Sequence, residues 1–255
     1  MKIIKSAAKW KKLKAGGLFK GRSVGFVPTM GALHEGHLSL VRRSKKENAV
    51  TVVSIFVNPA QFNDKGDLKH YPRPLKDDIK MLEAEGTDLL FLPGAGEMYA
   101  DDYAYKVTER DLSKTLCGAY RPGHFDGVLT VVMKLLNIVG ADKAYFGEKD
   151  YQQYLLIKGM AEAFFLATEI IPCPIVREED GLAMSSRNRR LGPVERALAP
   201  LFHKLLVLRR PPARIKKALA AAGFRPDYVE EFRGRRFGAV NLGKVRLIDN
   251  VQVKG

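Results

Sequence analysis

Short apolar runs alternate with longer stretches of helical character through residues 24–176. The runs are rich in Val, Ile and Phe, which is typical of strands that are buried on both faces of a parallel sheet. The stretches between them are long enough to cross over such a sheet as helices. We therefore predict an α/β fold with a doubly wound, Rossmann-like parallel sheet. The predicted strands are residues 24–28, 50–57, 89–92, 144–146 and 168–172.

The pattern changes after residue 190, where proline-containing breaks bound helical segments that continue to residue 221. A short strand-rich tail follows, in which residues 227–232 and 244–248 predict a hairpin or small sheet. We accordingly divide the chain into a large domain, residues 1–175, and a small C-terminal α+β domain, residues 176–255.

The N-terminal 14 residues alternate lysines with apolar side chains, which predicts a basic amphipathic surface helix. No uninterrupted apolar stretch approaches the roughly 18 residues of a membrane span, so we expect no membrane partner. Cys117 and Cys173 are the only two cysteines, in no metal-binding or redox pattern, which argues against a disulfide framework or a zinc site. We expect a cytoplasmic protein.

The net charge of +15, from 43 basic and 28 acidic residues, raises the alternative of a nucleic-acid-binding protein. The basic residues are spread along the whole chain in short groups and are not interleaved with aromatic side chains that could stack on bases. Such a charge also suits a solvated surface or a field that attracts anionic substrates. We expect no nucleic-acid partner.

The predicted strand 24–28 runs directly into the segment TMGALHEGH, residues 29–37, and then into an apolar helix. A strand, a glycine-containing turn and a helix start form a context in which free backbone N–H groups and the helix dipole bind phosphate. His34 and His37, three residues apart in a helical first turn, would present both rings on one face. Gly36 between them would leave room for a nucleotide against the backbone.

Other interpretations of the glycines and histidines fit less well. Two histidines could bind a metal, but the zinc-protease pattern is His-Glu-x-x-His and this segment reads His-Glu-Gly-His. Residues 16–23 match the P-loop spacing with Arg in place of Lys, yet they precede a strand instead of following one, so we interpret them as a loop.

Further polar residues follow predicted strands at the carboxyl edge of the sheet, where ligands of such folds bind. The amides of Asn58 and Gln61 suit a small polar acid, although Asn58-Pro59 also fits a simple turn. Lys149 is a compact positive charge suited to a phosphate in a transition state, and Asp150 could bind nucleotide or Mg²⁺ or neutralise Lys149. Arg121 and His124 would offer cations in a loop.

The stretch VPTMGALHEGH, residues 27–37, resembles the pantothenate synthetase (pantoate–beta-alanine ligase) family of nucleotidyltransferases with a His-x-Gly-His signature. Further blocks occur in the family's order. The resemblance covers roughly residues 20–192, and a last short matching block is LGKVRLID, residues 242–249. The blocks are FVNPAQF (56–62), YPR (71–73), RPGHFDGV (121–128), FGEKDYQQ (146–153) and DGLAMSSRN (180–188).

The resemblance implies ATP-dependent condensation of pantoate with beta-alanine through a pantoyl adenylate, with Mg²⁺, in a homodimer. The catalytic residues that it implies are His34, His37, Lys149, Ser185, Ser186 and Arg187. The implied ATP-binding residues are Pro28, Thr29, Met30, Gly36, His37, Gly147, Lys149, Asp150, Val176, Met184, Ser185 and Arg187. Pantoate is assigned to Met30, Asn58, Gln61 and Gln153. Tyr71, Arg121 and His124 are further implied site residues, and Asp77 is an implied metal ligand.

Two alternatives stay open at this point. Another member of the same superfamily would adenylate or cytidylylate a different substrate, and the amides of Asn58, Gln61 and Gln153 favour pantoate over it. A basic nucleic-acid-binding protein is the alternative from another class. The C-terminal part also looks shorter than the family's second domain, which makes its action as a lid over the site an open expectation.

Overall fold

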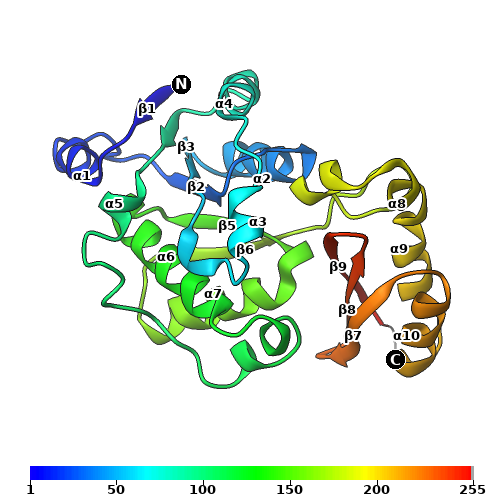
Figure 1. The fold of residues 1–255 in the computed structure, drawn as a ribbon. Coiled ribbons are helices and arrows are strands. Elements are labelled where there is room, and N and C mark those ends of the chain that lie inside the picture. The colour runs from blue at the N-terminus through cyan, green and yellow to red at the C-terminus, as the bar shows by residue number, and fades with distance from the viewer. Residues whose placement is uncertain (254–255) are drawn as a thin grey trace. The chain divides into compact units, whose positions relative to one another are not determined.

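The structure is a computed structural model that describes residues 1–253 and divides into two compact units. The first unit comprises Met1–Gly147 and Gln152–Cys173, and the second comprises Glu148–Tyr151 and Pro174–Gly255. Each unit has its own sheet (Figure 1) and its own hydrophobic core.

The first unit is built on a six-stranded parallel sheet with the strand order β1-β4-β3-β2-β5-β6. The chain runs outward from β2 through β3 to β4 and then returns to the other side of β2 for β5 and β6. The topological switch point therefore lies between β2 and β5, where ligands of doubly wound folds bind. The strands are β1 Lys2–Ile4, β2 Val24–Thr29, β3 Val50–Ile55, β4 Leu89–Phe91, β5 Lys143–Gly147 and β6 Glu169–Cys173.

Helices cover both faces of this sheet. Val27 of β2 and Leu90 of β4 share a buried cluster with Leu40 of α2 and Leu82 of α4, so α2 and α4 lie on one face. Phe91 points to the opposite face because side chains alternate along a strand, and Trp10 of α1 packs against it at 5.5 Å between ring centroids. The helices are α1 Ala7–Ala15, α2 Glu35–Glu47, α3 Lys65–Lys69, α4 Leu75–Ala84, α5 Ala95–Met98, α6 His124–Val139 and α7 Tyr151–Ala163.

The predicted fold class is confirmed, and each of the five predicted strands coincides with an observed one to within two residues at either end. The prediction for the N-terminus was wrong in part. Lys2–Ile4 form an edge strand parallel to β4, and only Ala7–Ala15 are helical. Trp10 is completely buried, which a surface helix would not require.

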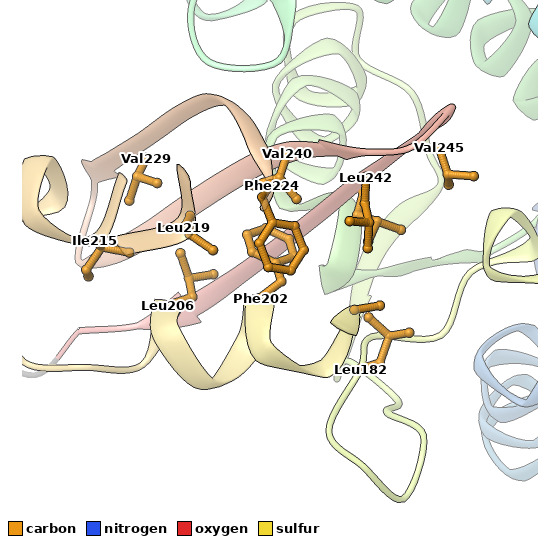
Figure 2. Packing of buried hydrophobic residues seen from close by; sticks show 12 residues of the cluster. Leu182, Phe202, Leu206, Ile215, Leu219, Phe224, Val229, Val240, Leu242 and Val245 are labelled. Atoms are coloured by element: carbon orange, nitrogen blue, oxygen red, sulfur yellow. The ribbon is translucent and has the colours of Figure 1, made fainter. Parts of the chain in front are cut away.

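The second unit packs three helices against a three-stranded antiparallel sheet of order β7-β8-β9. Its core gathers Phe202 and Leu206 of α9, Leu219 of α10 and Val240 of β8 (Figure 2). The elements are α8 Pro193–Leu198, α9 Pro200–Leu206, α10 Pro212–Ala221, β7 Arg225–Phe232, β8 Arg235–Leu242 and β9 Val245–Gln252.

The C-terminal sheet contains one strand, β8, in addition to the two that were predicted to form a hairpin or small sheet. Strand β8 was missed because Arg235 and Arg236 open it and interrupt the apolar pattern, although both arginines are buried in the structure. Cys117 and Cys173 are both buried free thiols. Within residues 1–253, no helix has the length and apolar composition needed to cross a membrane.

Candidate active site

The turn after β2 is shaped by the side chains of Thr29, the last residue of β2, and of Asp78 in α4. The Thr29 hydroxyl donates to the carbonyl of Ser54 at 2.8 Å and accepts from the N–H of Gly31 at 3.1 Å. Gly31 and Ala32 both have positive φ, at 78° and 51°. The buried Asp78 carboxylate of α4 accepts from the N–H groups of Ala32 and Leu33 at 2.9 and 2.8 Å. These bonds stabilise a left-handed backbone that would otherwise be costly outside glycine.

The two histidines of the His-x-Gly-His segment lie side by side, with ring centroids 4.1 Å apart. His34 is the N-cap of α2 with an extended backbone, so it lies just before the first turn in which we had expected it. Its Nδ1 accepts from the N–H of Gly36 at 3.1 Å. In the neutral ring the proton is therefore on Nε2, which can donate to a phosphate oxygen.

The expectation of free backbone N–H groups at this helix start needs correction. The N–H of Gly36 is taken by the His34 ring, and that of His37 donates to the His34 carbonyl at 2.8 Å. The two imidazoles and the positive end of the 13-residue helix α2 are what this segment offers to an anion.

Two of the three amides predicted to bind pantoate, those of Asn58 and Gln61, contact each other in the first unit. Asn58 caps the 3-10 turn Pro59–Gln61 and is buried, and its Nδ2 donates to Gln61 Oε1 and to the Gly127 carbonyl, both at 3.0 Å. Its Oδ1 accepts from the Tyr99 hydroxyl at 2.6 Å and from the Ala60 N–H at 3.3 Å. Both donors and both acceptor positions of Asn58 are thus occupied, so its geometry favours orienting Gln61 over contacting a substrate.

Gln61 links this cluster to Met30 and to the predicted basic loop. Its Nε2 lies 3.0 Å from the Met30 sulfur, and its carbonyl accepts from Arg121 at 3.2 Å and from His124 Nδ1 at 2.7 Å. Arg121 Nη1 lies 2.9 Å from His124 Nε2. Because a guanidinium only donates, His124 accepts at Nε2 and carries its proton on Nδ1. The prediction of two loop cations needs correction, since His124 is a neutral, buried residue that opens α6.

The two neighbouring glutamines of α7 differ in their surroundings. Gln152 is buried, and its amide bonds the backbone of Leu112, Thr115 and Cys117. Gln153 is half-buried and makes no side-chain hydrogen bond within residues 1–253, so its amide is available to a ligand. Tyr71 is buried and packs edge-on against Phe62 at 5.6 Å between centroids.

In the second unit, Lys149 lies in the 3-10 turn Glu148–Asp150, with Nζ 3.8 Å from the Asp150 carboxylate. That distance is beyond a hydrogen bond. The side chain of Lys149 is 19% exposed and that of Asp150 is 47% exposed. Gly147, predicted to contact ATP, ends β5 in the first unit, and a Cβ there would meet no atom within 4 Å.

The predicted phosphate loop of the second unit forms a small hairpin followed by a 3-10 turn. Met184 N–H donates to the Val176 carbonyl at 3.0 Å, which joins the two arms of the hairpin. Ser185 caps the turn Ser186–Arg190 by accepting from the Arg187 N–H at 3.2 Å. Ser186 is buried, whereas Ser185 and Arg187 are half-buried.

The described part of the chain holds no cluster of three or more His, Cys, Asp or Glu side chains that could bind a metal ion. Asp77 is exposed in the first turn of α4, and both oxygens of its neighbour Asp78 are bonded to backbone N–H groups. The donor set at Asp77 therefore does not fit a resident metal, and the prediction for Asp77 has no support from its neighbours.

Sequence reasoning missed two residues that shape the first unit's site, Asp78 and Tyr99. Burial raises the pKa of Tyr99 to about 12, with Tyr103 adding to the shift, so its hydroxyl stays protonated and donates to Asn58. Tyr99 follows the strand β4 at the carboxyl edge of the sheet, and that position was its only signal.

The sheet, its switch point and the paired histidines at the start of α2 define an α/β nucleotidyltransferase of the His-x-Gly-His class. The family model of pantoate-beta-alanine ligase matches residues 2–252. The chain therefore belongs to the pantoate-beta-alanine ligase family, and it is an ATP-dependent ligase of pantoate and beta-alanine.

Known relatives match nearly the full chain. Pantothenate synthetase of Bdellovibrio bacteriovorus is 53% identical over 244 residues, which are 96% of this chain and 95% of that protein. The pantoate-beta-alanine ligase of Francisella tularensis, solved with beta-gamma ATP and beta-alanine, is 40% identical, with a TM-score of 0.93 and coverage of 99% and 97%.

Pantothenate synthetase of Thermus thermophilus is also 40% identical, with a TM-score of 0.90, and each chain covers 100% of the other. The C-terminal part is thus not shortened relative to these proteins, and the expectation of a reduced second domain was wrong.

Proposed function

We propose that the enzyme joins pantoate to beta-alanine through a pantoyl adenylate and that it acts by positioning and charge stabilisation. A pantoate carboxylate oxygen attacks the α-phosphorus of ATP, and pyrophosphate leaves. The amine of beta-alanine then attacks the acyl carbon, and AMP leaves. The side-by-side rings of His34 and His37 at the start of α2 carry this proposal, because they offer N–H donors where a nucleotide's phosphates gain charge.

Residues of the first unit receive roles by their contacts. We assign pantoate to Met30, Gln61 and Gln153, and we assign Asn58 to the orientation of Gln61. Arg121 and His124 hold the Gln61 backbone, so they act on the same binding surface without contacting the substrate. The ATP-binding assignments of Pro28, Thr29, Gly36 and Gly147 follow from the family resemblance.

Residues of the second unit receive roles from the family resemblance and from their chemistry. We assign Lys149 to the α-phosphate, where a compact positive charge stabilises the transition state. The hydroxyls of Ser185 and Ser186 and the guanidinium of Arg187 suit the β- and γ-phosphates. Asp150, Val176 and Met184 complete the proposed nucleotide-binding set. We also propose that residues 176–255 form a lid domain that protects the acyl adenylate from water.

Three further proposals concern the enzyme's surroundings. Mg²⁺ enters with ATP, because this ion is commonly held by substrate phosphates and water and needs no cage of protein ligands. A homodimer is proposed from the family resemblance. The two buried free thiols suit a reducing cytoplasm.

The test is pyrophosphate release with ATP and pantoate, with and without beta-alanine. An adenylate mechanism gives a burst of about one pyrophosphate per site without beta-alanine and turnover with it. Release that strictly requires beta-alanine would contradict the intermediate.

In Lys149→Ala, we expect kcat/KM for ATP to fall by about 10²-fold or more, because a positive charge that stabilises the transition state is lost. Steady-state kinetics check this prediction, and full activity would refute the role of Lys149.

A further inference from the structure

The C-terminal block LGKVRLID ends at Asp249, a buried polar residue of strand β9, and is followed by a second one, Asn250. Their exposed fractions are 3% and 1%. Buried polar groups of this kind are costly unless each hydrogen bond is satisfied, so their partners indicate what they do. Within residues 1–253, the side-chain hydrogen-bond partners of both residues lie in the second unit.

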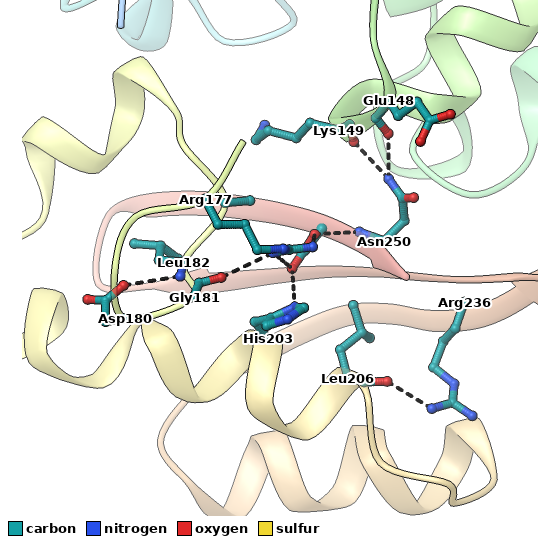
Figure 3. Close-up of polar contacts among 12 residues, drawn as sticks. Glu148, Lys149, Arg177, Asp180, Gly181, Leu182, His203, Leu206, Arg236 and Asn250 are labelled. Atoms are coloured by element: carbon teal, nitrogen blue, oxygen red, sulfur yellow. Dashed lines mark hydrogen bonds and ion pairs between the residues drawn. The ribbon is translucent and has the colours of Figure 1, made fainter. Parts of the chain in front are cut away.

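Asn250 holds the turn that carries Lys149. Its Nδ2 donates to the carbonyls of Glu148 and Lys149 at 2.8 and 3.0 Å (Figure 3). Its Oδ1 accepts from buried Arg235 at 2.6 Å, and Arg235 also pairs with the Glu148 carboxylate at 2.8 Å. The Asn250 side chain therefore fixes the carbonyl groups of both Glu148 and Lys149. Arg235 in turn fixes the side chain of Asn250.

Asp249 holds the hairpin that leads to Arg187. Its carboxylate forms a two-point ion pair with Arg177, at 2.7 and 3.0 Å, and accepts from His203 Nδ1 at 3.0 Å. Arg177 also donates to the Gly181 carbonyl at 3.1 Å, in the turn of the hairpin (Figure 3). Asn188 braces the other end of this segment through Glu178 and the Ala183 carbonyl.

We propose that Asp249 and Asn250 are positioning residues which orient, from adjacent places in β9, the two segments of the second unit that bind ATP. Neighbouring residues of a strand point to opposite faces of the sheet. Asn250 therefore contacts the Lys149 turn on one side of β9, and Asp249 contacts the hairpin that leads to Arg187 on the other. This inference rests on the proposed ATP roles of Lys149 and Arg187. It assigns a purpose to a sequence block that the proposed chemistry leaves unexplained.

The first test is Asn250→Asp, which preserves shape but removes the two donors. A displacement of the Lys149 turn of the order of 1 Å should lower kcat/KM for ATP by about tenfold or more. A general loss of folding would lower kcat and leave both KM values unchanged, so the selective result expected here is a rise in the KM for ATP while the KM for pantoate changes by less than about twofold. Asn241→Asp is the matched control, because Asn241 lies in β8 of the same sheet and bonds Asp227 and the Arg225 carbonyl instead.

A double-mutant cycle with Lys149→Ala separates the two proposals. If Asn250 acts through Lys149, Asn250→Asp changes activity by less than about twofold in the Lys149→Ala background. An undiminished loss there, or a loss no larger than in Asn241→Asp, would overturn the positioning role. Full activity of Lys149→Ala alone would instead refute the proposed function of Lys149, and the inference about Asn250 would fall with it.

Milder variants keep the proposal testable if Asn250→Asp does not fold. Glu148→Gln weakens the bond to Arg235 at a residue whose side chain is 25% exposed, and it should lower kcat/KM for ATP in the same selective way. For Asp249, Asp249→Asn keeps the shape of the side chain and removes the charge that pairs with Arg177, so it should raise the KM for ATP and leave the KM for pantoate within about twofold. An unchanged KM for ATP in this variant would overturn the role of Asp249.

Discussion

At the scale of single residues, His34 serves two purposes that a substitution can separate. Its Nδ1 caps α2, and its Nε2 is the atom proposed to bind phosphate. In His34→Asn, the side-chain oxygen can still accept from Gly36, so the free energy of unfolding should change by less than about 0.5 kcal/mol. Activity should nevertheless fall by about 10²-fold in kcat/KM for ATP, because the phosphate donor is lost.

Chemical denaturation and steady-state kinetics on the same preparations check this prediction. His34→Ala is the companion variant, and it should lose about 1 kcal/mol of stability as well as activity. If His34→Asn retained wild-type kcat/KM, the histidine would be a cap and nothing more.

The carboxylate of Asp78 organises the turn before His34, although no sequence pattern indicated it. In Asp78→Asn, an amide NH₂ would face a backbone N–H group, which should cost about 1–3 kcal/mol of unfolding free energy. Because the turn precedes His34, kcat/KM for ATP should also fall. Glu83→Gln, an exposed change in the same helix, is the control. Equal stabilities of the two variants would show that the turn does not depend on this carboxylate.

At the scale of elements, α6 and the turn Pro59–Gln61 approach so closely that only glycine fits between them. A Cβ on Gly127 would lie 2.3 Å from the carbonyl oxygen of Ala60 and 2.7 Å from the N–H nitrogen of Gln61. Gly127→Ala should therefore displace Gln61, raise the KM for pantoate and destabilise the fold by about 1–3 kcal/mol.

Gly159→Ala is the matched comparison, since Gly159 lies in α7 and a Cβ there would meet no atom within 4 Å. It should leave pantoate kinetics unchanged and stabilise the enzyme by about 0.5–1 kcal/mol. Thermal denaturation and pantoate titrations measure both effects. A normal KM for pantoate in Gly127→Ala would show that the contact between α6 and the turn Pro59–Gln61 does not affect pantoate binding.

At the scale of the whole molecule, stability should depend on pH through Asp249. Burial raises the pKa of this carboxyl, but the hydrogen bonds from His203 and Arg177 outweigh burial and hold the pKa below its ordinary value of 3.8. A depressed folded-state pKa adds stability above pH 3.8 that is lost as the pH falls through the folded-state value.

Unfolding free energies measured from pH 7 to about pH 2 should therefore decline more steeply below pH 3.8 in the wild type than in Asp249→Asn. The Asn variant is less stable at pH 7, so the two curves should converge in acid. Parallel curves would show that Asp249 does not contribute to acid unfolding.

The sequence by itself determined the α/β class, the five main strands and the paired histidines after β2. These are local properties, because strand burial appears as short apolar runs and the His-x-Gly-His segment is contiguous. The blocks of resemblance likewise pointed to the correct family from the sequence alone.

Only the tertiary structure decided which polar side chains support others. Asn58 and Gln61 were predicted as equal ligands, yet Asn58 is saturated by partners that are up to 69 residues away. Asp78 and Asn250 act across separations of 45 and 102 residues. Such bonds depend on how distant segments pack, and no periodicity within one segment encodes them. Strand β8 was not predicted for the same reason. A charged residue such as Arg235 is expected to be exposed, and only its distant partners show that it is buried.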